Sequence, residues 1–103
     1  MTIATTLHKI FASTPDRPLS AERIRTMVSL EMGEVICPSH FDREFRAFRY
    51  SKVLPVLKIK LDFHGQWRYV NSTKRIYVDN HNRWLNWEQK RAESKKLKLA
   101  NGK

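Results

Sequence analysis

The chain has 103 residues, 41% of them hydrophobic, which suits one small globular domain and argues against wholesale disorder. Lysine and arginine number 20 against 10 acidic residues, and the net charge is +10. No apolar run reaches the roughly 18 residues of a membrane span, the segment MTIATTLHKIF lacks the form of a signal peptide, and the single Cys37 excludes an internal disulfide framework. We therefore expect a cytoplasmic protein.

The positive charge is concentrated in the second part of the chain. Residues 1–38 are net neutral, residues 39–71 carry +4 and residues 72–103 carry +6. This distribution favours a neutral scaffold followed by a surface that attracts a polyanion, for which nucleic acid is the leading candidate. A high isoelectric point kept only for solubility is the alternative.

A first helix is predicted near the N-terminus. Thr5 or Thr6 is the expected N-cap, since a threonine hydroxyl can accept a hydrogen bond from the first turn. Leu7, Ile10 and Phe11 then supply an apolar face at helical spacing, which indicates one side packed into a core.

A proline-rich loop, residues 13–18, leads to a second helix. Ser20 is the expected N-cap of this helix, and Gly33 is the expected stop because glycine readily adopts the left-handed conformation that ends helices. In the connector that follows, we expect Val35 and Ile36 to be buried.

The segment SHFDREFRAFRYSK, residues 39–52, is predicted to form a third helix with two distinct faces. Phe41, Phe45 and Phe48 fall on one stripe at 100° per residue. Ser39 is the expected N-cap, with Asp42 in the position of a capping-box acid. The polar side carries Ser39, Arg43, Arg46 and Tyr50, with Arg49 on its flank. Arginine suits bidentate contacts with guanine or phosphate, so this helix is predicted to present guanidinium groups to an anionic partner.

A β-hairpin is predicted after Pro55, where the apolar period changes from 3.6 to 2. Residues 57–63 form the first strand, His64–Gly65–Gln66 the turn and residues 67–70 the return strand. A three-residue turn places Phe63, Leu61 and Asp62 opposite Trp67, Tyr69 and Arg68, whereas a two-residue turn at His64–Gly65 shifts the pairing by one. We expect the first register, because aromatic and opposite-charge pairs across strands are stabilising.

A last helix is predicted to begin at Asp79 or Asn80. Ile76–Tyr77–Val78 before it forms either a short extra strand or the lead into this helix. Trp84 and Trp87 lie on one side, but the apolar stripe stops there, so only the first turns are expected to dock. From about residue 94 the chain reads as a basic frayed tail. The expected division is a domain at residues 1–78 and a basic C-terminal arm at residues 79–103.

The order of helix, helix, arginine-bearing helix and hairpin resembles a winged helix-turn-helix domain. The residues that carry the resemblance are 17–24, 39–50 and 57–70, so it covers about residues 5–70. The connector before the third helix is longer than a tight helix–turn–helix turn. The expected fold class is α+β, with a three-helix core, a two-stranded hairpin wing and an extra C-terminal helix.

The resemblance implies a double-stranded DNA-binding protein, acting as a small transcriptional regulator or a DNA-accessory factor. It places the third helix in the major groove and the hairpin wing on the DNA backbone. The expected contacts on the helix are Ser39, His40, Arg43, Arg46 and Tyr50, with Arg49 on its flank. The expected contacts on the wing are Lys58, Lys60, His64, Gln66 and Arg68.

A protein-interaction module is the rival hypothesis. In it, the aromatic and basic C-terminal helix docks on a larger nucleic-acid-processing or host machine, or joins two copies in a homodimer. The residues expected to make that contact are Trp84, Trp87, Lys90 and Arg91. RNA binding is a third possibility, but the predicted sheet is small for stacking several bases.

Catalysis has little support in the sequence. Cys37 and His40 lie three residues apart, but no second pair completes a zinc site. Paired carboxylates and a glycine-rich phosphate loop are both missing from the sequence. We therefore expect no enzyme activity, metal or cofactor, with Cys37 as a small buried apolar residue and Trp67 and Tyr69 in the core.

Overall fold

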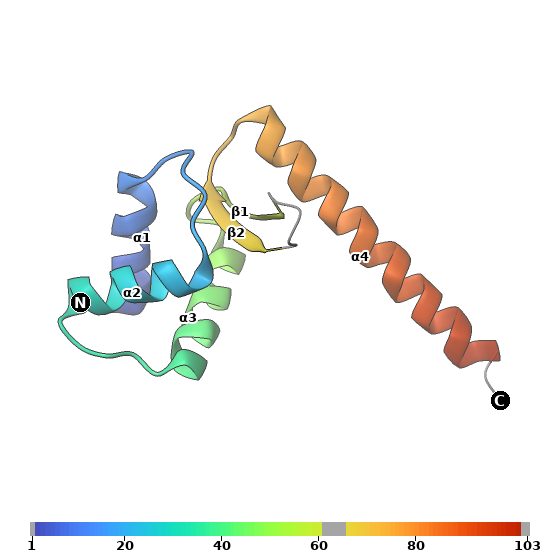
Figure 1. Cartoon of the computed structure of the whole chain (residues 1–103), viewed down its shortest axis with the longest axis horizontal. Coiled ribbons are helices and arrows are strands. Elements are labelled where there is room, and N and C mark those ends of the chain that lie inside the picture. The colour runs from blue at the N-terminus through green and yellow to red at the C-terminus, as the bar shows by residue number, and fades with distance from the viewer. Residues whose placement is uncertain (1, 61–65, 102–103) are drawn as a thin grey trace.

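A computed structural model describes residues 2–60 and 66–101, with side chains described as far as residue 94. Its elements, in chain order, are the helices α1 (Ile3–Ser13), α2 (Ala21–Met32) and α3 (Pro38–Ser51), the strands β1 (Val56–Lys60) and β2 (Trp67–Asn71), and the helix α4 (Arg75–Asn101). The first three helices gather on one side of the hairpin, and α4 leaves the other side as a long arm (Figure 1). The α+β layout with a two-stranded antiparallel hairpin and a C-terminal helix is confirmed.

Helix α1 begins earlier than the sequence suggested. Thr2, not Thr5 or Thr6, is the N-cap, and its hydroxyl accepts a hydrogen bond from the Thr5 N–H at 3.2 Å. The Thr5 hydroxyl accepts in return from the Thr2 N–H at 3.0 Å. The earlier start extends the apolar face back to Ile3, which is buried with Leu7, and this burial favours the extra turn.

Helix α2 has the ends that the sequence predicts. The Ser20 hydroxyl accepts a hydrogen bond from the Arg23 N–H at 3.2 Å, which confirms Ser20 as the N-cap. Gly33 ends the helix in the left-handed region with φ of 70°, where a side chain would be strained. Ile24 and Val28 are fully buried and fix the face that α2 turns to the core.

The connector between α2 and α3 buries only one of its two β-branched side chains. Ile36 is buried, but Val35 is 97% exposed, so the expectation for Val35 is wrong. Ile36 joins the core cluster that contains Phe41, whereas Val35 lies at the surface, so only one of these neighbours contributes to the core. Cys37, which follows, is also exposed, which contradicts its expected burial.

Helix α3 begins at Pro38, one residue before the expected start. Cys37 occupies the N-cap position without a side-chain hydrogen bond to the helix, so the expectation that Ser39 is the N-cap is wrong. Proline is favoured at the first helical position, because its φ is already helical and its missing N–H would be unpaired there. Ser39 therefore lies in the first turn, with its hydroxyl 3.2 Å from the Cys37 sulfur.

The rings of α3 form the centre of the core. Phe41, Phe45 and Phe48 are all buried, as the stripe predicted. The centroid of the Phe45 ring lies 5.4 Å from that of Phe41, 6.1 Å from that of Phe11 in α1 and 4.6 Å from that of Tyr69 in β2. Phe45 thus connects α1, α3 and the hairpin, and the expected core position of Tyr69 is confirmed.

The register of the hairpin differs from both expectations. Lys60 lies opposite Trp67, Ile59 opposite Arg68 and Lys58 opposite Tyr69. The pairings of Trp67, Tyr69 and Arg68 with residues 61–63 are therefore wrong, and the predicted turn at His64–Gly65 lies outside the described residues.

Burial explains this register. It places Leu57, Ile59 and Val70 on one face of the hairpin, and the exposed fractions of Ile59 and Val70 are both 0%. Burial of that face outweighs the smaller stabilisation of cross-strand pairs near the turn. A register set by burial alone is typical of hairpins in which one face is covered by another element.

The proline-rich segment between α1 and α2 covers the outer edge of β2. Leu19 N–H donates to the Tyr69 carbonyl at 2.8 Å, and Tyr69 N–H donates to the Leu19 carbonyl at 2.7 Å. Asp16 N–H donates to the Asn71 carbonyl at 2.9 Å. The segment was predicted only as a loop, and on the other strand the Lys58 carbonyl of β1 accepts a hydrogen bond from His81 of α4.

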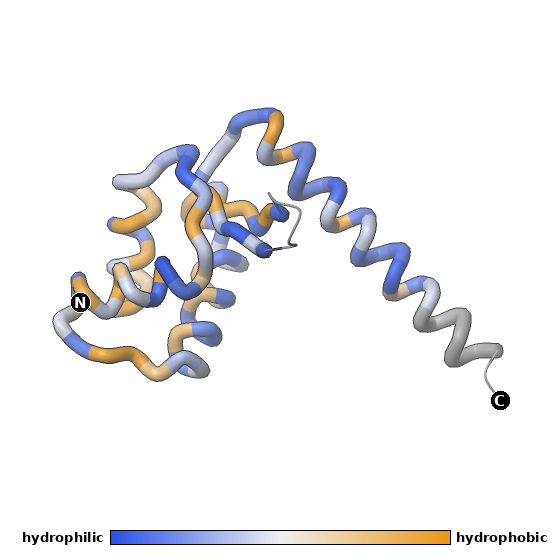
Figure 2. The backbone as a smooth tube through the Cα atoms, viewed as in Figure 1, coloured by the Kyte–Doolittle hydropathy of each residue, from blue (hydrophilic) through white to orange (hydrophobic). Residues whose placement is uncertain are grey.

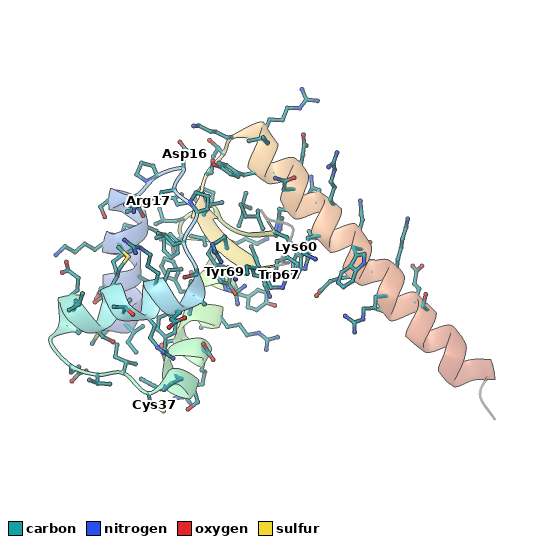
Figure 3. The ribbon with its side chains drawn as sticks, in the orientation of Figure 1. Asp16, Arg17, Cys37, Lys60, Trp67 and Tyr69 are labelled. Atoms are coloured by element: carbon teal, nitrogen blue, oxygen red, sulfur yellow. The ribbon has the colours of Figure 1, made fainter. Side chains whose placement is uncertain are left out.

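Asp16 also fixes the base of α4. It has a left-handed φ of 62°, and its carboxylate accepts a hydrogen bond from the Ser72 hydroxyl and lies 3.6 Å from the Lys74 ammonium. The Tyr77 hydroxyl donates to the Asp16 carbonyl at 3.4 Å. The labelled Asp16 lies beside the start of α4 in Figure 3, and these contacts set the direction in which α4 leaves the body.

Helix α4 is longer than expected at both ends. Residues 76–78 belong to it rather than to a strand, Asp79 lies inside it and not at an N-cap, and helix continues to Asn101 where a frayed tail was expected. Its first turns pack on β1, where Tyr77, Val78, His81 and Trp84 are half-buried. The rest is mostly hydrophilic (Figure 2) and rich in good helix formers, so its helicity depends on propensity rather than packing.

No helix in the described part of the chain is both long and apolar enough to cross a membrane.

Replacement of Phe45 tests the role of this ring. Phe45→Ala removes a buried ring that contacts three elements, so we expect the free energy of unfolding to fall by about 3–5 kcal/mol. Arg43→Ala, on the exposed side of the same helix, is the matched control and should change it by no more than about 0.5 kcal/mol. Urea titrations followed by circular dichroism measure both values, and equal effects of the two variants would contradict the assigned orientation of α3.

Candidate nucleic-acid interface

The face of α3 opposite its buried phenylalanines is open to solvent. Arg43 and Arg46 are exposed, and the Tyr50 side chain is 70% exposed. Because Phe41, Phe45 and Phe48 hold the other side of the helix in the core, these residues necessarily project outward. Helix α4 packs on β1 and leaves this face uncovered (Figure 1).

The outward side chains of α3 form one continuous surface. The Arg43 guanidinium lies 3.1 Å from His40 Nδ1, and the Arg46 guanidinium lies 5.6 Å from the centre of the Tyr50 ring. Ala47 lies between them, and its small side chain leaves a shallow hollow of about 440 Å³. We call the surface made by His40, Arg43, Arg46, Ala47 and Tyr50 the α3 face.

The arginines of the α3 face form no ion pair with an acid in the described part of the chain, although Asp42 lines the same shallow hollow. In the residues that the structure describes, the ion pairs involve Lys9, Lys74 and Arg75, and none involves α3. The spacing of Asp42 and Arg46 suits a helical ion pair, but the two do not form one here. Arg43 and Arg46 are therefore available to an external anion.

The N-terminus of α3 is occupied by the thiol of Cys37. The Ser39 hydroxyl and the backbone N–H groups of His40 and Ser39 interact with this sulfur, and together they lower the pKa of the Cys37 thiol from its usual value. A phosphate at Ser39, as the sequence suggested, would compete with the thiolate for these donors. Cys37 lies at the end of α3 remote from the hairpin (Figure 3).

Arg49 is turned away from the α3 face. Its guanidinium carbon lies 5.0 Å from the centre of the Phe45 ring and 4.9 Å from that of the Tyr69 ring. Its Nε atom is buried and has no hydrogen-bond partner. The structure therefore places Arg49 against the aromatic core and not with Arg43 and Arg46.

The hairpin residues predicted to contact DNA lie in two different environments. Lys58 Nζ lies 5.1 Å from the Trp67 ring and 5.2 Å from the Trp84 ring, and burial, with a smaller effect of nearby Arg49, lowers the pKa of Lys58. Lys60 is exposed, with its ammonium 5.8 Å from the Trp67 ring. Lys58 thus faces α4 while Lys60 faces solvent (for Lys60 and Trp67, see Figure 3).

The rest of the predicted wing lies around its return strand. The Arg68 guanidinium donates to the Trp67 carbonyl at 3.1 Å and to the Gln66 side-chain oxygen at 2.8 Å. Gln66 is exposed, and His64 lies outside the described residues. Lys60, Gln66 and Arg68 are therefore the predicted wing residues at the surface near the turn.

The predicted partner-binding residues of α4 are likewise divided. Trp84 is half-buried, with its ring centroid 5.3 Å from that of Trp67 and 5.8 Å from that of His81. Trp87 is 52% exposed, with the Arg91 guanidinium 5.4 Å from its ring centre. Lys90 and Arg91 are exposed. Only Trp87, Lys90 and Arg91 therefore lie open to a partner.

Sequence reasoning missed one grouping, in which Arg49, Lys58 and Trp84 line the same groove between α3, β1 and α4. A hydrogen bond from His81 Nδ1 to the Lys58 carbonyl at 3.2 Å fixes α4 there. The three residues lie on three different elements, and no spacing in the sequence indicates that they meet.

Comparisons with protein-family models, with curated proteins and with solved structures give no significant match to this chain. Among the described residues, no three His, Cys, Asp or Glu side chains come close enough to hold a metal ion.

The environment of Cys37 predicts an unusually reactive thiol. Its lowered pKa means a larger thiolate fraction at neutral pH, so we expect faster alkylation by iodoacetamide than in the urea-unfolded chain. Ser39→Ala removes the largest cause and should move the midpoint of the rate–pH profile upward. Mass spectrometry follows the reaction, with Ser51→Ala at the other end of α3 as the control. A midpoint that is the same in Ser39→Ala would contradict this assignment.

Proposed function

We propose that the protein binds double-stranded DNA, with α3 in the major groove and the hairpin on the adjacent backbone. The observation that carries this proposal is the α3 face, where Arg43 and Arg46 lie exposed on a rigid helix without acidic partners in the described structure. The net charge of +10 supplies the long-range attraction to a polyanion.

The α3 face has the chemistry of base and phosphate recognition. A major groove about 12 Å wide admits one α-helix, and arginine makes the commonest specific contact, to guanine O6 and N7. Arg43 and Arg46 lie three residues apart and are neighbours on the helix surface. His40 and Tyr50, near the two ends of the same face, are suited to hydrogen bonds with the backbone.

The surface of the hairpin supports the same orientation. Lys60 and Arg68 are cations near its turn, and Tyr69 packs the hairpin directly on α3 through Phe45. Contacts from such cations to phosphates position a protein without reading sequence. The exposed arginines of α3 and the adjacent hairpin suit a small transcriptional regulator or DNA-accessory factor. We propose the cytoplasm as its compartment, which suits its one unpaired cysteine.

The double variant Arg43→Ala with Arg46→Ala tests the proposal. We expect it to weaken duplex binding about 10- to 100-fold and to lower the slope of log K against log salt by about 2, since each lost phosphate contact removes about 0.9. Fluorescence anisotropy with duplexes selected from a random pool measures both quantities.

The charge-matched control is Lys9→Ala with Arg75→Ala, which removes the same net charge from α1 and from the base of α4. Both cations pair with acids in the structure and lie outside α3. The proposal fails if no duplex binds at low salt, or if this control weakens binding as much as the α3 variant does.

A second candidate function is protein interaction through α4, and the exposure of Trp87 favours it. A half-exposed indole beside Arg91 is a residue pair enriched where proteins bind each other. The occupant would be either a larger nucleic-acid-processing machine or the α4 of a second copy.

Photo-crosslinking tests this second candidate. A benzophenone amino acid at position 87 is expected to give one discrete covalent adduct in cells that express the chain, because the partner covers this indole. The same amino acid at position 35, where Val35 is 97% exposed, is the control. A smear, or the same products from both positions, would count against a dedicated surface on α4.

A further inference from the structure

A groove runs between the C-terminal end of α3, β1 and the first half of α4. Its volume is about 640 Å³, within the range of sites that hold a ligand or an anchoring side chain. Tyr50 and Lys52 lie at one side, and His81, Trp84 and Leu85 lie at the other. It shares only Tyr50 with the α3 face, so it is a separate surface.

The floor of the groove is aliphatic. Leu54, Val56 and Leu57 are half-buried along it, and Leu85 of α4 is 39% exposed at its wall. Branched aliphatic walls suit an aliphatic or aromatic side chain inserted from outside. They are less suited to a nucleobase, which binds best between flat aromatic faces.

Among the described residues the cations of the groove form no ion pair, and the nearby Glu88 acts against the lowering of the Lys58 pKa without reversing it. Arg49 and Lys58 are close enough for Arg49 to lower the pKa of Lys58, and both lie against aromatic rings. Two of the residues that line the groove each carry a buried donor, Arg49 Nε and Trp84 Nε1, that has no hydrogen-bond partner in the described structure. Donors left unpaired in this way are unfavourable, and an acceptor brought in by a ligand would relieve them.

The charged residues around the groove give it a net positive charge. Lys52 and Lys58 line it together with Arg49, whereas Glu88 is the one acid among its lining residues. No ion pair of the described structure involves any of these groups. The groove therefore combines an apolar floor with a wall of net positive charge.

We propose that this groove binds an acidic segment of a partner protein, in which Asp or Glu flanks an apolar side chain. The apolar side chain would lie on Leu54, Leu57 and Leu85, while the carboxylates would accept hydrogen bonds from Arg49 and the Lys58 ammonium. Complementarity of charge and of apolar surface carries the proposal.

The test uses the full chain, with the Arg49 Nε–H and Trp84 indole N–H signals observed by NMR. The probe is the peptide acetyl-Glu-Leu-Asp-Leu-Glu-amide, and we expect both signals to shift saturably with it. The peptide acetyl-Glu-Ser-Asp-Ser-Glu-amide keeps the charge and lacks the apolar side chains. The peptide acetyl-Gln-Leu-Asn-Leu-Gln-amide keeps the apolar side chains and lacks the charge. Both should bind about tenfold more weakly or not at all.

Two variants locate the site. Lys58→Met keeps an aliphatic side chain between the two indoles and removes the charge. Leu85→Ser removes an exposed apolar side chain from the wall of the groove. We expect each variant to weaken binding about fivefold or more. Arg43→Ala, outside the groove, should leave the affinity unchanged.

Several outcomes would overturn the proposal. Absence of any shift at millimolar peptide, or equal shifts with the uncharged peptide, would show that the groove does not select an acidic ligand. Equal shifts with the serine peptide or with inorganic phosphate would show a simple anion site, and tighter binding of oligothymidylate than of the acidic peptide would assign the groove to nucleic acid.

Discussion

The packing of the Phe45 ring against Phe11, Phe41 and Tyr69 is the interaction on which the other parts of the structure depend. It joins α1, α3 and the hairpin at one point, and aromatic rings at such separations contribute both buried area and preferred geometry. Because Phe41, Phe45 and Phe48 must all point inward, the rotation of α3 about its axis is fixed. Arg43, Arg46 and Tyr50 then project outward, so the presentation of the proposed DNA-binding surface follows from the burial of three rings.

The basic side chains of this protein fall into two physical classes. Arg43, Arg46 and Lys60 keep their charges in water, where they act at long range and are sensitive to salt. Arg49 and Lys58 lie on aromatic faces, which stabilise a cation without a neighbouring acid. Adjacent residues in the sequence of α3 can therefore serve different surfaces, and a count of basic residues does not say which charges a partner meets.

Much of the fold follows from local pattern. The stripe of phenylalanines, the Ser20 cap and the Gly33 stop are all readable in the sequence, because each depends on a few neighbouring residues. The sequence pattern does not reveal the hairpin register, the pairing of residues 15 and 19 with β2, or the path of α4. These features depend on which apolar faces are buried by elements distant in the sequence, and α4, which packs on β1, begins after both strands in the chain.

The sequence by itself determined that α3 is amphipathic and that its polar side is rich in arginine, because helical period and side-chain chemistry are properties of one short segment. Only the tertiary structure decided that Arg43 and Arg46 remain open while Arg49 turns to the rings, and that Lys58 meets Trp84 in a groove. The reason is that α4, anchored by the Asp16 contacts at its base, covers one face of the hairpin and leaves the α3 face free. That packing decides which basic side chains are covered, and the spacing of residues along the chain does not predict the outcome.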